Sequence, residues 1–318
     1  FKLSKEKEKE RKMARTKNGL NKDDRSPIEI FVDAIQKNDI KKVEQMIKEG
    51  ININEAYNWN TTPFSTVVET GNMEIFNLLL KNGLQLNSVE DRWTSPLYVA
   101  AEHGRIEFFP DLVNAGCDVN RPSQYDKLTP LHASCKGKYF DCVDYLLSVG
   151  AKPDIADRKG VNALMLACSL NSIDLVQKIL DFGVDINKQD NDGWTPLIYA
   201  VMENNYDLVQ LLLSKGADQS IVSDVDYTAL TYAATMGYDD ILQLLITNGG
   251  NVYHNTEESS SRYALDITIT PSTKTILSKE MNWVRRRNFL IFLYQSNILS
   301  FQSETHPISN TPQTQKLN

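Results

Sequence analysis

The 318-residue chain has few cysteines and no long apolar run. Four cysteines are too few for a disulfide scaffold, which fits a reducing compartment, and they show no zinc-type pairing. The longest apolar stretch, residues 289–298, is interrupted by polar residues and is shorter than the roughly 20 residues of a membrane-spanning helix. The chain begins with a Lys- and Glu-rich segment, so we expect neither a transmembrane helix nor a secretory signal peptide.

Signatures of catalysis are also missing from the sequence. It contains no nucleophile elbow, phosphate-binding loop, HExxH motif or kinase signature. Paired acids such as Asp239-Asp240 are expected at helix starts, where the helix dipole favours negative charge. We therefore predict a protein that is not an enzyme and has no catalytic, metal-binding or cofactor-binding residues.

The net charge of −7 is unevenly distributed. Residues 1–26 contain ten Lys/Arg and five Asp/Glu, so the remaining 24 basic and 36 acidic residues carry a net charge of −12. Such an acidic body repels a phosphate backbone, and nucleic-acid binding is not expected. The apolar fraction of 41% is ordinary for a globular protein, and the chain is long enough to bury a substantial core.

Glycine recurs along the chain at intervals of 33 or 34 residues. The members of this series are Gly50, Gly83, Gly116, Gly150, Gly183, Gly216 and Gly249. Each follows a segment with apolar residues at helical spacing, such as NYDLVQLLLSKG. Each glycine is therefore expected to end a helix in the left-handed conformation, which glycine enters freely.

Two further series share this period and predict a second, shorter helix in each unit. Residues that tolerate left-handed geometry mark its end, at Asn38, Gly71, Gly104, Lys138, Asn171, Asn204 and Gly237. Lys138 is the exception to this rule, and Gly137 beside it is an alternative for the left-handed position. A hydroxyl or amide cap starts the helix and is usually followed by proline, as in Thr195-Pro196-Leu197.

The segment Thr129-Pro130-Leu131-His132 carries a complete TPLH signature, and residues 27–278 resemble the ankyrin-repeat family. The resemblance implies an all-α solenoid of helix-turn-helix units with β-hairpin-like loops and terminal capping helices. It also implies that His132 is structural and bonds backbone groups in neighbouring turns. Pro110 departs from the pattern and is expected to bend a second helix. The four cysteines are expected to pack in the core: Cys117, Cys135, Cys142 and Cys168.

The predicted domain organisation places the repeats between two tails. Residues 1–25 form a basic disordered tail, 26–56 an N-terminal capping repeat and 57–257 six ankyrin repeats. Residues 258–278 form a degenerate C-terminal repeat without a clear second helix. Residues 279–300 form an amphipathic helix that either caps the stack or docks a partner, and 301–318 form a disordered tail.

The resemblance further implies a protein-binding surface, because family members typically bind partners through hairpin tips and the concave ends of first helices. Carried over to this sequence, the hairpin tips contribute Trp59, Asp91, Arg92, Trp93, Tyr125, Lys127, Arg158, Lys159, Asp192, Trp194, Asp224 and Tyr227. The first-helix ends contribute Glu69, Glu102, His103, Lys136, Met202 and Glu203.

Two patterns stand out in this predicted surface. Five of the six tips carry an aromatic residue of a type that often anchors interfaces, although packing between neighbouring hairpins would also explain the rings. Basic residues make the middle of the surface positive, between acidic residues on both sides: Lys127, Lys136, Lys138, Arg158 and Lys159. We expect a partner segment with acidic groups at its centre and basic ends.

The expected function is that of a non-enzymatic scaffold or adaptor that binds protein partners and no small-molecule substrate. We expect it to be monomeric and intracellular, in the cytoplasm or the nucleus. One alternative is the substrate-recruiting arm of a larger ligase, kinase or acyltransferase whose catalytic domain lies outside this sequence. Another assigns Lys5 to Lys17 to nuclear import or anion binding, although alternating Lys and Glu also fit a solvated tail.

Overall fold

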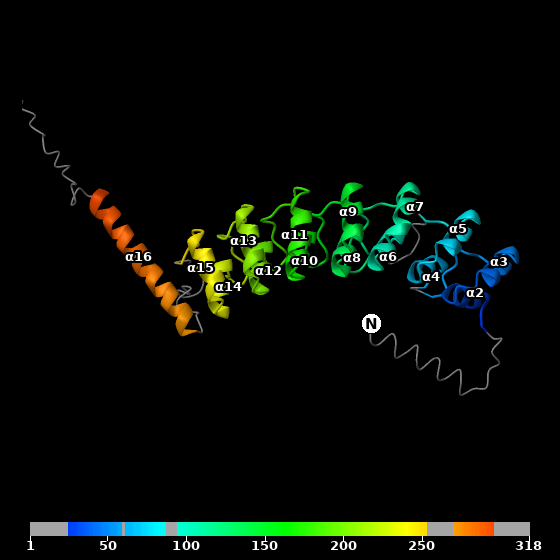
Figure 1. The fold of residues 1–318 in the computed structure, drawn as a ribbon, viewed down its shortest axis with the longest axis horizontal. Coiled ribbons are helices and arrows are strands. Elements are labelled where there is room, and N and C mark those ends of the chain that lie inside the picture. Colours follow the sequence, from blue (N-terminus) through cyan, green and yellow to red (C-terminus); the bar gives the residue numbers. More distant parts are fainter. Residues whose placement is uncertain (1–24, 59–60, 87–93, 253–269, 296–318) are drawn as a thin grey trace, which may run out of the picture.

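The computed structural model describes residues 25–58, 61–86, 94–252 and 270–295, with side chains in the last helix up to residue 283. These residues form fifteen α-helices and one 3₁₀ helix. The helices follow one another in an elongated stack, from α2 and α3 at one end to α16 at the other (Figure 1). The predicted tails, residues 1–24 and 296–318, lie outside the described residues, as do residues 253–269 of the predicted degenerate repeat.

Each unit of the stack contains a first helix and a second helix joined by a tight reversal. The first helices are α2 (Pro27–Gln36), α4 (Pro63–Thr70), α6 (Pro96–Glu102), α8 (Pro130–Gly137), α10 (Ala163–Ser169), α12 (Pro196–Met202) and α14 (Ala229–Met236). The second helices are α3 (Ile40–Lys48), α5 (Met73–Lys81), α7 (Phe109–Asn114), α9 (Phe140–Ser148), α11 (Ile173–Leu180), α13 (Tyr206–Ser214) and α15 (Asp239–Thr247). A longer helix, α16 (Pro271–Gln295), follows α15.

The first helices begin at the predicted capping residues. In the six units after the first, the cap side chain accepts a hydrogen bond from the backbone N–H three residues later: Thr62, Ser95, Thr129, Asn162, Thr195 and Thr228. At Thr62, Thr129 and Thr228 the bond is reciprocal, because the side chain three residues on binds the N–H of the cap. Such a cap contributes about 1 kcal/mol to stability.

The first helices end in a left-handed residue, as the second series predicts. In the fourth unit this residue is Lys138 itself (φ 55°), and Gly137 keeps ordinary helical geometry as the last residue of α8. The Lys138 amine donates a hydrogen bond of 3.0 Å to the carbonyl oxygen of Leu170 in the next unit. Gly137 serves a different purpose, since a Cβ there would lie 2.1 Å from the ring of Tyr139.

Pro110 changes the second helix of the third unit. A 3₁₀ helix, η1 (Ile106–Phe108), replaces the first turn, and α7 begins at Phe109 with Pro110 in its first turn. The missing N–H of proline is harmless at this position, because the first N–H groups of a helix have no intrahelical partner. The predicted bend is therefore a change of helix type at the start of the segment.

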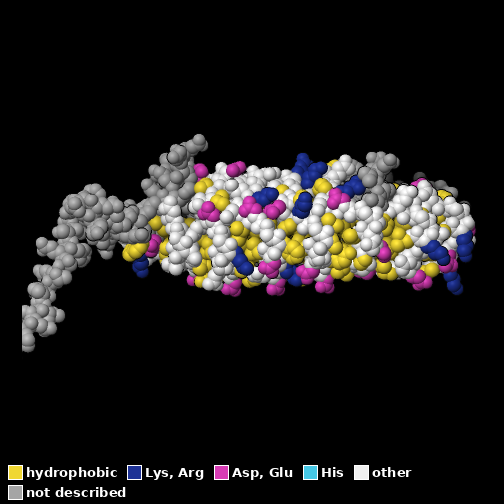
Figure 2. Space-filling model, turned by 90° about the horizontal axis from the view of Figure 1, so that it is seen from above, with side chains coloured by type: hydrophobic (Ala, Val, Ile, Leu, Met, Phe, Trp, Pro, Cys, Tyr) yellow, Lys and Arg dark blue, Asp and Glu magenta, His cyan; other side chains and the backbone are white. Residues whose placement is uncertain are grey.

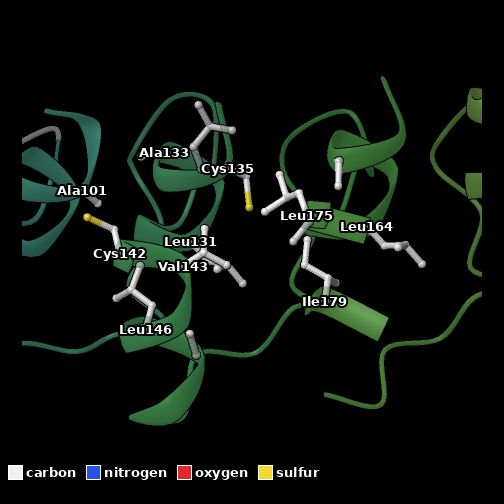
Figure 3. Packing of buried hydrophobic residues seen from close by; sticks show 14 of the residues in the cluster. Ala101, Leu131, Ala133, Cys135, Cys142, Val143, Leu146, Leu164, Leu175 and Ile179 are labelled. Atoms are coloured by element: carbon white, nitrogen blue, oxygen red, sulfur yellow. The ribbon is translucent and has the colours of Figure 1, made fainter. Parts of the chain in front are cut away.

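The core is continuous along the stack, and each first helix contacts the first helix of the next unit. Figure 3 shows part of it between the fourth and fifth units, where Leu131, Val143 and Leu146 are buried beside Leu164 and Leu175. The four cysteines are all buried, which confirms their predicted place in the core. Because each unit packs only on its neighbours, the energetics are those of a linear array.

Helix α16 crosses the predicted boundary between the degenerate repeat and the amphipathic helix. It begins at Pro271, one period after α15, which is the place of the second helix in an eighth unit. Leu277 and Met281 are buried, and the Thr273 hydroxyl donates a 2.6 Å hydrogen bond to the Asp239 carboxylate of α15. The next place in the glycine series, one period after Gly249, is occupied by Asn282, and the helix runs through it and extends past the stack.

Candidate protein-binding surface

Hairpin-like loops connect the units, and those that the structure describes in full are closed by a backbone hydrogen bond. Asp157 N–H donates to Val161 O at 2.9 Å, and Asp190 N–H donates to Trp194 O at 3.0 Å. The tips are also bonded to one another, since Asn191 N–H donates to Lys159 O at 3.0 Å. No strand is assigned within the described ranges, so these loops are rows of bonded turns rather than a sheet.

The carboxylates of two loops hold the tips in shape. Asp157 Oδ1 accepts hydrogen bonds from the backbone N–H groups of Lys159 and Val161, at 2.8 and 3.0 Å. Asp190 Oδ1 accepts equivalent bonds from Asp192 and Trp194, at 3.0 and 2.8 Å. Side chains carried by these tips therefore start from a rigid backbone, which reduces the entropy lost on binding.

The middle of the surface carries a basic band, which we define as Lys127, Lys136, Arg158 and Lys159. All four side chains are exposed. Among the described residues, no carboxylate forms an ion pair with any of them. Lys138, which the sequence also places here, is bonded to the Leu170 carbonyl instead. In Figure 2, Lys and Arg side chains project from the upper edge of the stack near its middle.

Exposed acidic residues lie on both sides of the basic band. Glu69 and Glu102 stand on the N-terminal side, at the ends of α4 and α6. Asp192, Glu203 and Asp224 stand on the side towards α16, and all three are exposed. The structure thus preserves the alternation of charge along the stack. Four predicted residues lie outside the described residues: Trp59, Asp91, Arg92 and Trp93.

The aromatic residues of the tips differ in their surroundings. Tyr125 is 54% exposed. Trp194 and Tyr227 are half-buried and stack with ring centroids 6.2 Å apart and an interplanar angle of 20°. Packing between neighbouring hairpins, the second explanation offered by the sequence, therefore applies to Trp194 and Tyr227.

Two tyrosines of the first helices, which were absent from the predicted surface, contact these rings or the hairpin that carries one of them. Tyr232 of α14 lies 6.0 Å from Trp194 and 5.7 Å from Tyr227, measured between ring centroids. The Tyr199 hydroxyl, on α12, donates a 2.7 Å hydrogen bond to Asp190 Oδ2. The repeat period could have found them, since Tyr199 and Tyr232 occupy one place in consecutive first helices.

The remaining predicted residues lie at the ends of first helices. His103 follows α6, is half-buried, and its Nδ1 lies 2.9 Å from the Val99 carbonyl oxygen. Met202 ends α12 and is half-buried. Within the part of the chain that the structure describes, no group of His, Cys, Asp and Glu is arranged to hold a metal ion. In the same part, no helix is both long and apolar enough to cross a membrane.

A family model described as "Ankyrin repeats (3 copies)" matches the chain over residues 31–123, 112–190 and 164–256. The chain belongs to the ankyrin-repeat family. The matched residues run from α2 to beyond α15, so the prediction of an all-α ankyrin solenoid is confirmed. Ankyrin repeats are general protein–protein interaction modules, and the exposed charges and rings described above lie on such a module.

A solved structure supports the same assignment of the ankyrin fold. It is the crystal structure of the ankyrin repeat domain of Bcl-3, described as a unique member of the IkappaB protein family. It matches with a TM-score of 0.61 and 25% sequence identity, over 70% of this chain and 100% of that one. No match was found among curated protein sequences.

Proposed function

We propose that the ankyrin stack is a non-enzymatic adaptor that binds an extended segment of a partner protein along its hairpin tips and first-helix ends. Acidic groups of the partner lie over the basic band. The observation that carries this proposal is the unpaired state of Lys127, Lys136, Arg158 and Lys159 among the described residues. The monomeric state and the intracellular location of the adaptor remain predictions.

Electrostatics favours this orientation of the partner. The four exposed cations of the basic band form a local positive region on a chain whose net charge is −7. A partner with the opposite order of charges is steered into one register, because a shift of the partner along the stack brings charges of the same sign together. The bonded tips supply a rigid backbone for this recognition, so the tip residues Lys127, Arg158 and Lys159 start from fixed positions.

The test reverses two charges of the basic band. Partners captured with the intact chain are identified, purified and titrated against the wild type and the double variant Lys136→Glu/Lys159→Glu. We expect binding to the variant to weaken at least tenfold, because each reversal replaces attraction with repulsion. The control is Lys41→Glu/Lys152→Glu, which changes the charge equally at two exposed positions outside the band. Equal affinity of every partner for wild type and band variant would contradict the proposal.

A further inference from the structure

Three aromatic rings, those of Trp194, Tyr227 and Tyr232, contact one another towards the α16 end of the stack, and the hydroxyl of a fourth residue, Tyr199, is bonded to Asp190 in the hairpin of Trp194. We define the aromatic cluster as Trp194, Tyr199, Tyr227 and Tyr232. Trp194 and Tyr227 come from two hairpins, Tyr199 from α12 and Tyr232 from α14. All four side chains are half-buried, so part of each remains open to solvent.

The fold does not require rings at these places. The residues one and two periods before Trp194 are Val161 and Leu128, and those before Tyr199 are Leu166 and Ala133. The same loop and helix geometry forms around these smaller residues in the preceding units. Aromatic residues at this end of the stack therefore add a surface property beyond packing.

The ionisable groups around the aromatic cluster are acidic. Burial is the main cause that raises the pKa of Tyr199, and the carboxylates of Asp190, Asp157 and Asp192 raise it further. Burial also raises the pKa of Tyr232, with Glu203 among the neighbours that add to it. Among the described residues, no Lys or Arg forms an ion pair with Asp190, Asp192 or Glu203. The cluster thus lies beside carboxylates that no cation pairs directly among the described residues.

We infer that the aromatic cluster, with Asp192 and Glu203 beside it, is the binding site for an arginine side chain of the partner segment. This inference rests on the proposed function and assigns one of the partner's basic ends. A cation over an aromatic face is attracted by the ring quadrupole, and a nearby carboxylate adds to that attraction. The charge of the site fits a cation and opposes an acidic group.

The ring geometry selects arginine over lysine. The centroids of Trp194, Tyr227 and Tyr232 lie 5.7 to 6.2 Å from one another, so the rings contact each other and leave no space to enclose a compact ammonium group. A cation must bind on the outer face of the cluster. The planar guanidinium stacks on such a face and keeps its N–H groups directed at carboxylates, whereas an ammonium group remains strongly hydrated.

The position of the site also predicts the spacing of charges in the partner. The hairpin of Trp194 is one unit from that of Arg158 and Lys159, and the hairpin of Tyr227 is two units away. Neighbouring helices pack about 8–10 Å apart, so the two sites are separated by about 10–20 Å. An extended chain covers about 3.3 Å per residue, which places the arginine about three to six residues from the acidic groups.

Peptide probes on the full chain test the inference by fluorescence anisotropy. The first probe is fluorescein-Glu-Gly-Glu-Gly-Glu-Gly-Gly-Ser-Arg-Gly-Arg. Matched probes replace both arginines with citrulline, which has nearly the same shape without the charge, or with lysine. We expect the arginine probe to bind about three to thirty times more tightly than the citrulline probe, because a cation over aromatic rings raises the affinity by about that factor. It should also bind more tightly than the lysine probe. Equal affinities for arginine and citrulline, or for arginine and lysine, would overturn the assignment.

Variants locate the effect on the aromatic cluster. Tyr227→Phe keeps the ring and should preserve the preference for arginine over citrulline, whereas Tyr227→Leu should reduce it to less than twofold. Asp192→Asn/Glu203→Gln should also reduce the preference. Asp174→Asn/Asp207→Asn, which removes the same charge from exposed positions on α11 and α13, should not. Thermal unfolding of each variant verifies folding, and a full preference in folded Tyr227→Leu would refute the site.

The same measurements separate this inference from the proposed function. If the citrulline probe binds and Lys136→Glu/Lys159→Glu weakens it, the basic band is active whatever the arginines contribute. If, in that case, the arginine probe binds no more tightly than the citrulline probe, only the aromatic site is overturned. If reversal of the band changes nothing while Tyr227→Leu removes the arginine preference, the aromatic site stands and the role of the basic band is wrong.

Discussion

His132 Nε2 lies 3.1 Å from the carbonyl oxygen of Val161, so the imidazole of one repeat binds the hairpin of the next. The other ring nitrogen, Nδ1, is 3.2 Å from the backbone N–H of Thr129, which can only donate. Nδ1 is therefore the acceptor and Nε2 carries the proton, which it donates to Val161. A second proton on Nδ1 would break the bond from Thr129, in a ring that is 1% exposed.

The first prediction concerns stability against pH. Burial is the main cause that lowers the pKa of His132 below its ordinary 6.5. Below that value the unfolded chain binds a proton that the folded chain does not, so His132 stabilises the fold above about pH 6.5 and this contribution falls as the pH drops. Each pH unit below pH 6.5 lowers the free energy of unfolding by up to about 1.4 kcal/mol, until the pKa of His132 in the folded chain is reached.

Urea unfolding at pH 7.5 and pH 5.5 measures this effect. The comparison variant is His132→Gln, since glutamine can form a capping box without titrating. We expect the wild type to lose more stability than the variant between the two pH values, while the variant is the less stable protein at pH 7.5. Other titrating groups are common to both proteins and cancel in the difference. An equal loss in the two proteins would show that His132 is not the titrating group.

The second prediction concerns two glycines with similar backbone angles, one in a hairpin and one at the end of a helix. Gly160 and Gly183 both have positive φ, at 83° and 73°. A Cβ at Gly160 would lie 2.5 Å from the backbone nitrogen of Asn191, whereas a Cβ at Gly183 would meet nothing within 4 Å. Gly183→Ala should therefore cost about 1 kcal/mol, for the left-handed backbone alone. Gly160→Ala should cost at least about 1 kcal/mol more, because the next hairpin must move.

Chemical denaturation of the two variants provides the measurement. The clash at Gly160 also predicts a local effect: hydrogen exchange of the Asn191 amide should accelerate in Gly160→Ala, since its bond to Lys159 O is strained. Gly183→Ala serves as the matched control and should leave that amide unchanged. Equal costs for the two substitutions would mean that the hairpins do not rely on this close approach.

Most of the fold could be predicted from the sequence, because each structural device recurs seven times with the same period. Capping residues such as Thr195 and stop glycines such as Gly216 act locally, so their positions alone predict the helix ends. The sequence left open, or placed differently, those features that depend on neighbouring residues. Lys138 takes the left-handed conformation because the fold requires it there, and Gly137 is small because of the ring of Tyr139. Helix α16 runs through Asn282, where the other units have a glycine that ends the second helix.

The candidate surface was less predictable than the fold. Charges that the family pattern assigns to the surface, such as Lys136 and Asp192, are exposed, since exposure follows from position in the repeat. It could not show which rings contact one another, because Trp194 and Tyr232 are far apart in sequence and meet only across two units. Tyr199 was missed for a related reason, since its hydroxyl bond to Asp190 connects a helix to a loop.

The third prediction concerns a hairpin position at which the last described hairpin has aspartate and the two preceding hairpins have glycine. Asp226 has φ 63° at the place where the two preceding hairpins have Gly160 and Gly193. An L-residue is strained there, although aspartate tolerates the conformation better than most. Asp226→Gly should therefore stabilise the chain by about 0.5 to 1 kcal/mol in chemical denaturation. Asp224→Gly removes the same charge two residues away, where φ is not positive, and should give no gain. A gain from both variants would point to relief of charge repulsion instead.

The last prediction concerns the reactivity of the cysteines. All four are buried, and burial raises the pKa of Cys117 and Cys142 to about 11 and that of Cys135 to about 12. Burial also raises the pKa of Cys168. Because the thiolate is the reactive form, a disulfide reagent such as DTNB at pH 8 should modify the folded chain at least about 100 times more slowly than the unfolded chain.

The order in which the cysteines react tests how the stack opens. Cys135, Cys142 and Cys168 are at most 1% exposed and lie in the fourth and fifth units, whereas Cys117, which follows α7 of the third unit, is 7% exposed. In a linear array the units open locally, so mass spectrometry after brief labelling in mild urea should find Cys117 modified first. When the chain is fully unfolded in concentrated denaturant, all four thiols should react at similar rates. Equal labelling rates at all four sites in mild urea would instead indicate that the stack unfolds as one cooperative unit, since each thiol would then wait for the same global event.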